Sequence, residues 1–210
     1  VEAVRQYSGT TVATGSSAGT TIGQTTLAAD TSGYMANKAA IMNALGLSGD
    51  ARAHLRAGVE IRSSGDLTVS SDWNLWSASR AGGEPGYLSL RAAGNLNING
   101  SISDGFNTVA RTAALQTGDS WSYRLVAGAD LGAANMMQTR SDQTGDLTVA
   151  GNKLIRTGTG SIEMAAGRDI ALRTASNTPA VVYVAGTKVT PPADFITPDG
   201  AVFSERGGRL

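Results

Sequence analysis

Acidic and amide side chains recur at one position of a short sequence pattern and are the first candidates for chemistry. Each lies within two residues of a glycine and directly precedes an apolar residue. Carboxylates bind calcium, but a calcium-binding repeat would need a denser Gly-Gly-x-Gly-x-Asp array than this chain has. Asp and Asn side chains also hydrogen-bond backbone N–H groups at bends. We predict this second role for Asp66, Asn95, Asp130, Asp146 and Asp169.

Aromatic residues near the expected strands are the second set of candidate functional residues. Aromatic faces beside Asn, Asp and Arg are typical of sugar or partner recognition. Large aromatic side chains are more often buried, however. In that competing interpretation Trp73 and Tyr123 point inward, and Trp76 and Trp121 cover the core. The residues kept as possible ligand or partner contacts are Trp76, Trp121 and Tyr87.

The remaining polar residues of the sequence do not indicate a catalytic site or a metal site. His54 is the one histidine and cysteine is absent, whereas metal sites need several convergent ligands. A Ser-His-Asp site would have to use the same histidine. Asp72, Glu84, Asp104 and Asp119 fall in expected loops, but no spacing singles out two of them as a glycosidase pair. The sequence therefore predicts no catalytic residue, no metal, no cofactor and no enzyme.

Pairs of apolar residues predict the short strands that would position these candidate residues. In four places two apolar residues flank one position, and a second such pair begins eight residues after the first. Alternation puts both side chains of a pair on one face of a strand. The linkers hold glycine and end in Asp or Asn, which suits a corner between two sheets better than a hairpin. The pairs are Val59 and Ile61 with Leu67 and Val69, Leu88 and Leu90 with Leu96 and Ile98, Tyr123 and Leu125 with Leu131 and Ala133, and Ile162 and Met164 with Ile170 and Leu172.

Strand, corner and strand repeated along the chain predict an all-β fold, a parallel β-helix in which each coil stacks on the last. Trp73 and Leu75 are expected to add a third, inward-facing strand to the first coil. We expect Leu96 and Ile170 to fill the interior alike, so that aspartate at either position unfolds the chain.

The spacing leaves the number of coils ambiguous. The first pairs start 29, 35 and 39 residues apart, but Gly-Asp-Leu-Thr-Val at 65–69 recurs at 145–149, eighty positions later. Four coils of about twenty residues would fit the second count. We interpret the difference as loop insertions plus one additional partial coil between 131 and 162.

The remaining segments flank or interrupt the coils. Residues 1–30 predict short strands or irregular structure, and apolar residues at helical spacing predict one short α-helix near residues 34–45, with Gly46 as its stop. We expect three parts: 1–50, packing on or capping the coils; 51–190, the coils; and 191–210, an extended tail. Smaller features are expected as a loop over 78–86, a strand over 108–115 and a buried strand over 180–186.

Composition excludes several classes of protein. The net charge is zero and only 16% of residues are charged, which argues against nucleic-acid binding. Glycine makes up 27 of 210 residues, which favours turn-rich β structure. The absence of cysteine means that the fold does not depend on disulfides. No apolar run is long enough to predict a transmembrane segment.

Three stretches, 56–69, 88–102 and 157–172, resemble the passenger repeats of filamentous-haemagglutinin-like exoproteins. These are very large surface proteins of Gram-negative bacteria that are exported by two-partner secretion. The resemblance covers about 51–190 and implies a right-handed parallel β-helix, a secreted or cell-surface location and an outer-membrane transporter as partner of the parent protein. It also implies roles in adhesion, biofilm or contact-dependent inhibition. The Asn-Pro-Asn-Gly-Ile type motif of the family's secretion domain is absent, so the chain resembles an internal piece.

Three functions follow as expectations. The first is a structural shaft segment of a surface adhesin that supports cell adhesion or biofilm, while other parts bind an unidentified cell-surface receptor or glycan. The second is a carbohydrate-binding adhesin module that uses the loop aromatics. The third is a β-helical polysaccharide lyase or hydrolase.

Overall fold

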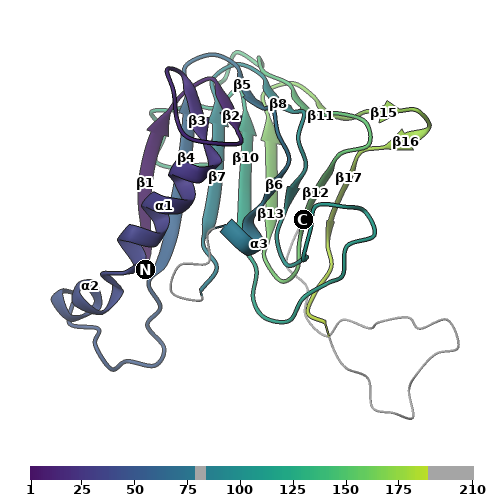
Figure 1. The fold of residues 1–210 in the computed structure, drawn as a ribbon. Coiled ribbons are helices and arrows are strands. Elements are labelled where there is room, and N and C mark those ends of the chain that lie inside the picture. The colour runs from purple at the N-terminus through teal and green to yellow at the C-terminus, as the bar shows by residue number, and fades with distance from the viewer. Residues whose placement is uncertain (79–83, 189–210) are drawn as a thin grey trace, which may run out of the picture.

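A computed structural model describes residues 1–78 and 84–188, and three parallel sheets dominate it (Figure 1). Sheet A contains five strands that pair in chain order. They are β1 (Glu2–Ser8), β4 (Arg56–Ser63), β7 (Tyr87–Ala92), β10 (Ser122–Ala127) and β13 (Ile162–Ala166).

Sheets B and C are built from shorter strands. Sheet B has the order β14 (Ile170–Leu172), β11 (Leu147–Val149), β8 (Leu96–Ile98), β5 (Leu67–Val69), β2 (Thr11–Ala13) and β3 (Thr21–Gly23). Sheet C has the order β17 (Val181–Val184), β12 (Leu154–Thr157), β9 (Ile102–Ser103) and β6 (Trp73–Asn74). A two-stranded antiparallel ribbon, β15 (Thr174–Ala175) and β16 (Thr178–Pro179), lies between β14 and β17 in the chain.

The chain visits the three sheets in one repeated order. From β4 onward the successive strands lie in sheets A, B and C, and we call each visit to all three a circuit. Equivalent strands pair in parallel, and Val59, Leu88, Tyr123 and Ile162 align across sheet A. The prediction of an all-β chain with parallel strands is confirmed.

The inward faces of the three sheets form one apolar core. The predicted pairs Leu88 with Leu90 and Leu96 with Ile98 are fully buried, as are most of their counterparts in neighbouring circuits. Trp73 is buried in β6, which confirms a third strand in the first circuit. Leu75 is buried as predicted, but it belongs to the helical turn Leu75–Ala78 that follows the strand.

The third circuit corrects the predicted coil count. Its strand in sheet B is β11, with Leu147 and Val149 buried, whereas Leu131 is only half-buried in a loop. The two Gly-Asp-Leu-Thr-Val segments therefore lie two circuits apart, with β8 between β5 and β11. The prediction of loop insertions was right, and the additional partial coil was wrong, because residues 128–146 are an insertion at the corner between sheets A and B.

The helices also differ from the prediction. The structure has α1 (Gln24–Met35), α2 (Lys38–Ala44) and the single turn α3 (Leu75–Ala78), so one helix over 34–45 was wrong in extent and α1 was missed. Thr, Ser and Gly within α1 are weak helix formers. The helix is stabilised instead by tertiary packing, because Leu27, Thr31 and Met35 lie on one face of α1 and are buried.

Two further expectations fail. Ile170 and Leu172 are 48% and 50% exposed, because β14 is the edge strand of sheet B and no described strand stacks beyond it. Residues 108–115 form no strand, and only an isolated bridge joins Phe106 to Leu115. The predicted strand over 180–186 is present as β17, but it is half-buried.

The structure distributes the expected parts of the chain as follows. Residues 1–50 add β1 and β2 to sheets A and B, and α1 contacts β3 and β4 near one end of the stack (Figure 1). The expected tail, 191–210, and most of the expected 78–86 loop lie outside the described residues.

Candidate functional site

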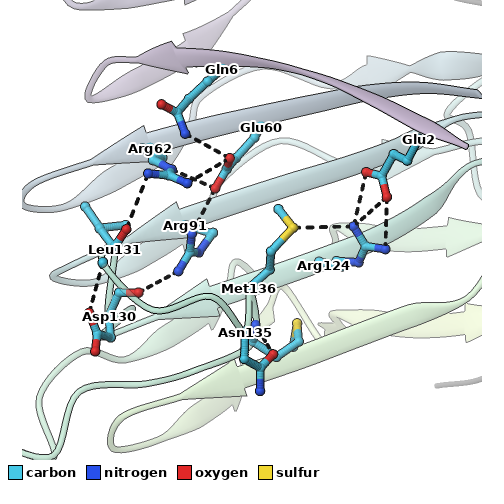
Figure 2. A network of polar contacts seen from close by, with 12 residues as sticks. Glu2, Gln6, Glu60, Arg62, Arg91, Arg124, Asp130, Leu131, Asn135 and Met136 are labelled. Atoms are coloured by element: carbon cyan, nitrogen blue, oxygen red, sulfur yellow. Dashed lines mark hydrogen bonds and ion pairs between the residues drawn. The ribbon is translucent and has the colours of Figure 1, made fainter.

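The outer face of sheet A carries a buried ionic cluster. Val59 and Ile61 point inward, so Glu60 between them points outward, and by register it lies beside the outward residues of β7. Arg91 Nη1 donates to Glu60 Oε1 at 2.9 Å, and Arg62 Nε donates to the same oxygen at 2.7 Å (Figure 2). We call Glu60, Arg62 and Arg91 the sheet A cluster.

The 128–146 insertion covers this cluster. Arg91 Nη2 donates to the carbonyl of Asp130 at 2.6 Å, and Arg62 Nη1 donates to the carbonyl of Leu131 at 3.3 Å (Figure 2). The loop thereby excludes water from Glu60 and Arg91, which are 3% and 0% exposed. The cluster therefore fastens a loop to the sheet and leaves no charge free for a ligand.

The electrostatics of Glu60 follow from these contacts. Burial alone would raise the pKa of the Glu60 carboxyl, because the charged form loses its hydration. Hydrogen bonds from Arg62, Arg91 and Gln6 together outweigh burial and hold the pKa below its ordinary value. Glu60 is therefore a buried carboxylate that stays ionised, unlike a general acid, which needs a raised pKa.

A polar pocket of about 200 Å³ lies further along the same face. Tyr87, half-buried, is stacked beneath Arg124, whose Cζ lies 4.5 Å from the ring centroid. Arg124 also pairs with Glu2 at 3.2 Å. Ser122, Ser161 and Glu163 complete the lining together with Tyr123. Hydroxyl, carboxylate and aromatic groups at this site are of the kind that binds a sugar.

The other two aromatic candidates lie elsewhere. Trp121 is 1% exposed, and its ring packs so closely over Gly86 that a Cβ there would come within 2.9 Å of it. Its ring is therefore not accessible to a ligand. Trp76 is half-buried in α3, beside sheet C, so the structure does not bring the three candidates into one site.

The recurring acidic and amide residues form a ladder along one corner. The backbone nitrogen of Asn95 donates to Asp66 Oδ1 at 2.7 Å, that of Asp146 donates to Asn95 Oδ1 at 2.9 Å, and that of Asp169 donates to Asp146 Oδ1 at 3.3 Å. The predicted bonding to corner N–H groups is confirmed for Asp66, Asn95 and Asp146, although the bonds run between circuits. Asp169 takes part in the ladder through its backbone nitrogen. Asp130 differs: it accepts from the Gly132 amide within its own loop.

A second insertion is fastened in the same way. Arg156 in β12 is fully buried on the outer face of sheet C, and its Nη2 donates to the carbonyls of Thr108 and Ala110 at 2.8 and 2.9 Å. Its Cζ lies 3.9 Å from the Phe106 ring centroid, and its Nη1 donates to the Tyr183 hydroxyl at 3.1 Å. Arg156 therefore holds the 104–119 loop, as Arg91 holds 128–146.

The loop carboxylates are engaged in contacts within the fold. Asp72 accepts from the Ser101 amide at 2.7 Å and pairs with Lys153 at 3.1 Å. Asp104 accepts from the Trp121 amide at 2.7 Å. Glu84 pairs with Lys38 and, at 3.4 Å, with His54 Nδ1.

Two further catalytic patterns yield no site. Residues 15–19 read Gly-Ser-Ser-Ala-Gly, the letters of a nucleophile elbow, but they form the loop between β2 and β3, where Ser17 Oγ accepts from the Gly23 amide at 3.0 Å. His54 is engaged with Glu84 instead. Within residues 1–78 and 84–188, no cluster of three or more His, Asp or Glu is placed to hold a metal ion.

Sequence reasoning missed both arginine clusters. Arg91 and Arg156 occupy outward positions, where a charge normally indicates a solvated face. The burial of each arginine depends on an insertion that comes from another part of the chain, so the strand sequences carry no local signal for it.

The chain shows no detectable relative: no family model, no curated protein and no solved structure matches it significantly. None of the helices in the described part of the chain has the length and apolar character needed to cross a bilayer.

Proposed function

We propose that this chain is a shaft segment of a large secreted bacterial surface adhesin of the filamentous-haemagglutinin type, and that its three sheets form a right-handed parallel β-helix. The supporting observation is the repeated order of sheets A, B and C with equivalent residues in register. Each circuit buries its apolar row on its neighbours, and continuous backbone ladders between circuits resist extension. The shaft would hold distant binding parts away from the bacterial cell and would itself have no catalytic role.

The partners follow from this role. Other parts of the parent protein would bind the host or bacterial receptor or glycan, and an outer-membrane transporter of two-partner secretion would export it. Two features support a passive segment: the sheet A cluster and Arg156 use their charges to fasten loops, and the loop carboxylates Asp72 and Glu84 are paired.

Pulling a single molecule by its two ends tests the shaft role. We expect the chain to lengthen in successive steps of about one circuit, because each circuit is held by contacts with its neighbours. Extension without measurable resistance would contradict the proposal. Replacing Leu96 by aspartate should abolish the steps, which shows that they arise from the stacked core.

A carbohydrate-binding module is the second candidate, and the pocket beside Tyr87 favours it. The purified chain can be applied to a glycan array. The shaft role predicts no saturable binding. Binding that is lost in Tyr87→Ala and kept in Trp76→Ala would favour the second candidate, because Tyr87 lines that pocket and Trp76 does not.

A further inference from the structure

The corner between β8 and β9 contains a reactive pair of residues. Asn99 is followed by Gly100, and this is the one Asn-Gly pair in the 210 residues of the sequence. Glycine lacks a Cβ, so its backbone nitrogen approaches the side-chain carbonyl carbon of a preceding asparagine more easily than that of any other residue. Asn-Gly is for this reason the dipeptide most prone to spontaneous deamidation.

The reaction needs only water and the two residues themselves. The Gly100 nitrogen forms a bond to Cγ of Asn99, the Cγ–Nδ2 bond breaks, and ammonia leaves with the proton of the Gly100 amide. Water then opens the cyclic imide at either of its carbonyl carbons. The product is aspartate or isoaspartate, and in isoaspartate the main chain runs through Cβ and Cγ and is longer by one atom.

The fold presents the asparagine and withholds the nucleophile. Asn99 is exposed at the corner, whereas Gly100 is buried. The Gly100 nitrogen donates to the Val69 carbonyl in the preceding circuit at 2.9 Å. A Cβ on Gly100 would lie 2.1 Å from the Ser71 carbonyl oxygen, so the backbone of Gly100 packs directly against that circuit.

The residue after the pair is fixed as well. The Ser101 nitrogen donates to Asp72 Oδ1 at 2.7 Å in the preceding circuit. The Ser101 hydroxyl accepts from the Leu154 nitrogen at 3.2 Å in the following one. Gly100 cannot turn its nitrogen toward the Asn99 side chain until such contacts open, and local opening is rare in the packed part of a fold.

We infer that Asn99 is a site of spontaneous deamidation and that the stacking of circuits holds the reaction back. The extent of modification then records the time that this corner has spent open. Isoaspartate makes the opening irreversible, because the longer main chain does not fit between the bonds to Val69 and Asp72. The inference requires only the stacked circuits and does not depend on the role of the chain as a shaft.

The test incubates the full chain at neutral pH, in buffer and in concentrated urea, and follows Asn99 by peptide mass spectrometry. In urea we expect Asn99 to be modified before any other asparagine. In buffer its modification should be at least about tenfold slower, because the reaction tracks the population in which the corner is open. Chromatography of the peptides separates the aspartate product from isoaspartate.

Variants of Asp72 test the contact that closes the corner. Asp72→Ala removes the acceptor of the Ser101 amide and should accelerate the reaction in buffer about five- to tenfold. Asp72→Asn keeps an acceptor oxygen and should retain the slow rate. Lys153→Met is the matched control, because it removes the ion pair with Asp72 and leaves the bond to Ser101 in place. Thermal melts establish that the variants are folded.

Three results would overturn the inference. Equal rates for Asn99 in buffer and in urea would mean that the stack gives no protection. Faster reaction of a different asparagine in urea would mean that Asn99 is not the reactive site. If folded Asp72→Ala reacts no faster than the unchanged chain, opening of this corner does not control the modification.

Discussion

Asp66 and Asn95 occupy the same corner of successive circuits, and the backbone nitrogen of Asn95 donates to Asp66 Oδ1 at 2.7 Å. Asn95 repeats the arrangement with the amide of Asp146 at 2.9 Å. A carboxylate or amide oxygen thus satisfies a backbone donor in the next circuit, at a point where the corner interrupts the sheet ladders. The recurrence of Asp and Asn in the sequence reflects this stacking requirement and needs no bound ion.

Replacing Asn95 by alanine should therefore weaken the stack. The change leaves the Asp146 amide without its acceptor, and we expect the free energy of unfolding to fall by about 1–2 kcal/mol. Asn97→Ala is the matched control, since Asn97 lies half-buried in β8, the strand that begins just after Asn95, and away from the corner. It should change stability by less than about 0.5 kcal/mol. Urea unfolding measures both, and equal losses would refute a special role for the corner.

Aspartate at two apolar positions should have very different effects. Leu96 is fully buried between neighbouring circuits, so Leu96→Asp places a charge in the core and should unfold the chain, whose total stability is expected to be about 5–15 kcal/mol. Ile170 is 48% exposed on an edge strand, and Ile170→Asp should cost less than about 1 kcal/mol. Circular dichroism melts distinguish them. A folded Leu96→Asp variant would contradict the core assignment.

Removal of the buried carboxylate in the sheet A cluster should cost more stability than removal of a partly exposed one. Glu60→Gln leaves Arg91 charged and buried, and we expect a loss of about 3 kcal/mol, at the lower end for breaking a buried pair. Glu2→Gln makes the same change on the same face, but its pair with Arg124 is partly exposed and contributes no more than about 1 kcal/mol. Similar losses in the two variants would mean that the cluster is not desolvated.

The contribution of Glu60 to stability should also depend on pH. The pKa of Glu60 is lower in the folded chain than its ordinary value, so the unfolded chain binds more protons between the two values. Its contribution is therefore fully present above the ordinary carboxyl pKa of about 4.3, and it is lost as the pH falls through the lower folded value. Stability measured from pH 6 down to pH 3 should fall less steeply in Glu60→Gln than in the unchanged chain. Parallel curves would exclude Glu60 as a source of acid sensitivity.

The stacked pairs could be predicted from the sequence because alternation is a local property. Val59 and Ile61 share one face wherever a strand forms, and so do Leu88 and Leu90. The third circuit could not be predicted in this way. Leu131 follows Tyr123 at the expected distance, but the chain makes a loop there and reaches sheet B only at Leu147. The eight-residue spacing between apolar pairs does not indicate where an insertion occurs or how long it is.

The candidate site was less accessible to such reasoning, because it depends on contacts between distant residues. Arg91 is buried only because the 128–146 loop returns over sheet A, and α1 forms because its buried face meets Val59 and Trp73. Neither contact has a local signature. Tyr87 was selected from its type and its position near an expected strand, whereas the pocket beside it depends on Arg124 and Glu163 from two other strands.

Arg156 should control access to the 104–119 loop, and trypsin can measure this. Two of its hydrogen bonds go to loop carbonyls, at Thr108 and Ala110, and Arg111 follows them directly as a cleavage site. Arg156→Met removes both bonds, each contributing about 1 kcal/mol, so the open form of the loop should become at least about tenfold more populated. Cleavage after Arg111 should accelerate by the same factor, because proteolysis tracks the open population when opening is fast.

The control for this experiment is Arg173→Met, which removes an exposed arginine from the chain without touching the loop. Its cleavage rate at Arg111 should match that of the unchanged chain. Global unfolding would also accelerate cleavage, so the melting temperature of Arg156→Met must be compared with the digestion temperature. If Arg156→Met stays folded and Arg111 is cut no faster, Arg111 contacts to Asn152 and Pro179 hold the loop instead, and the loop-fastening role of Arg156 is wrong.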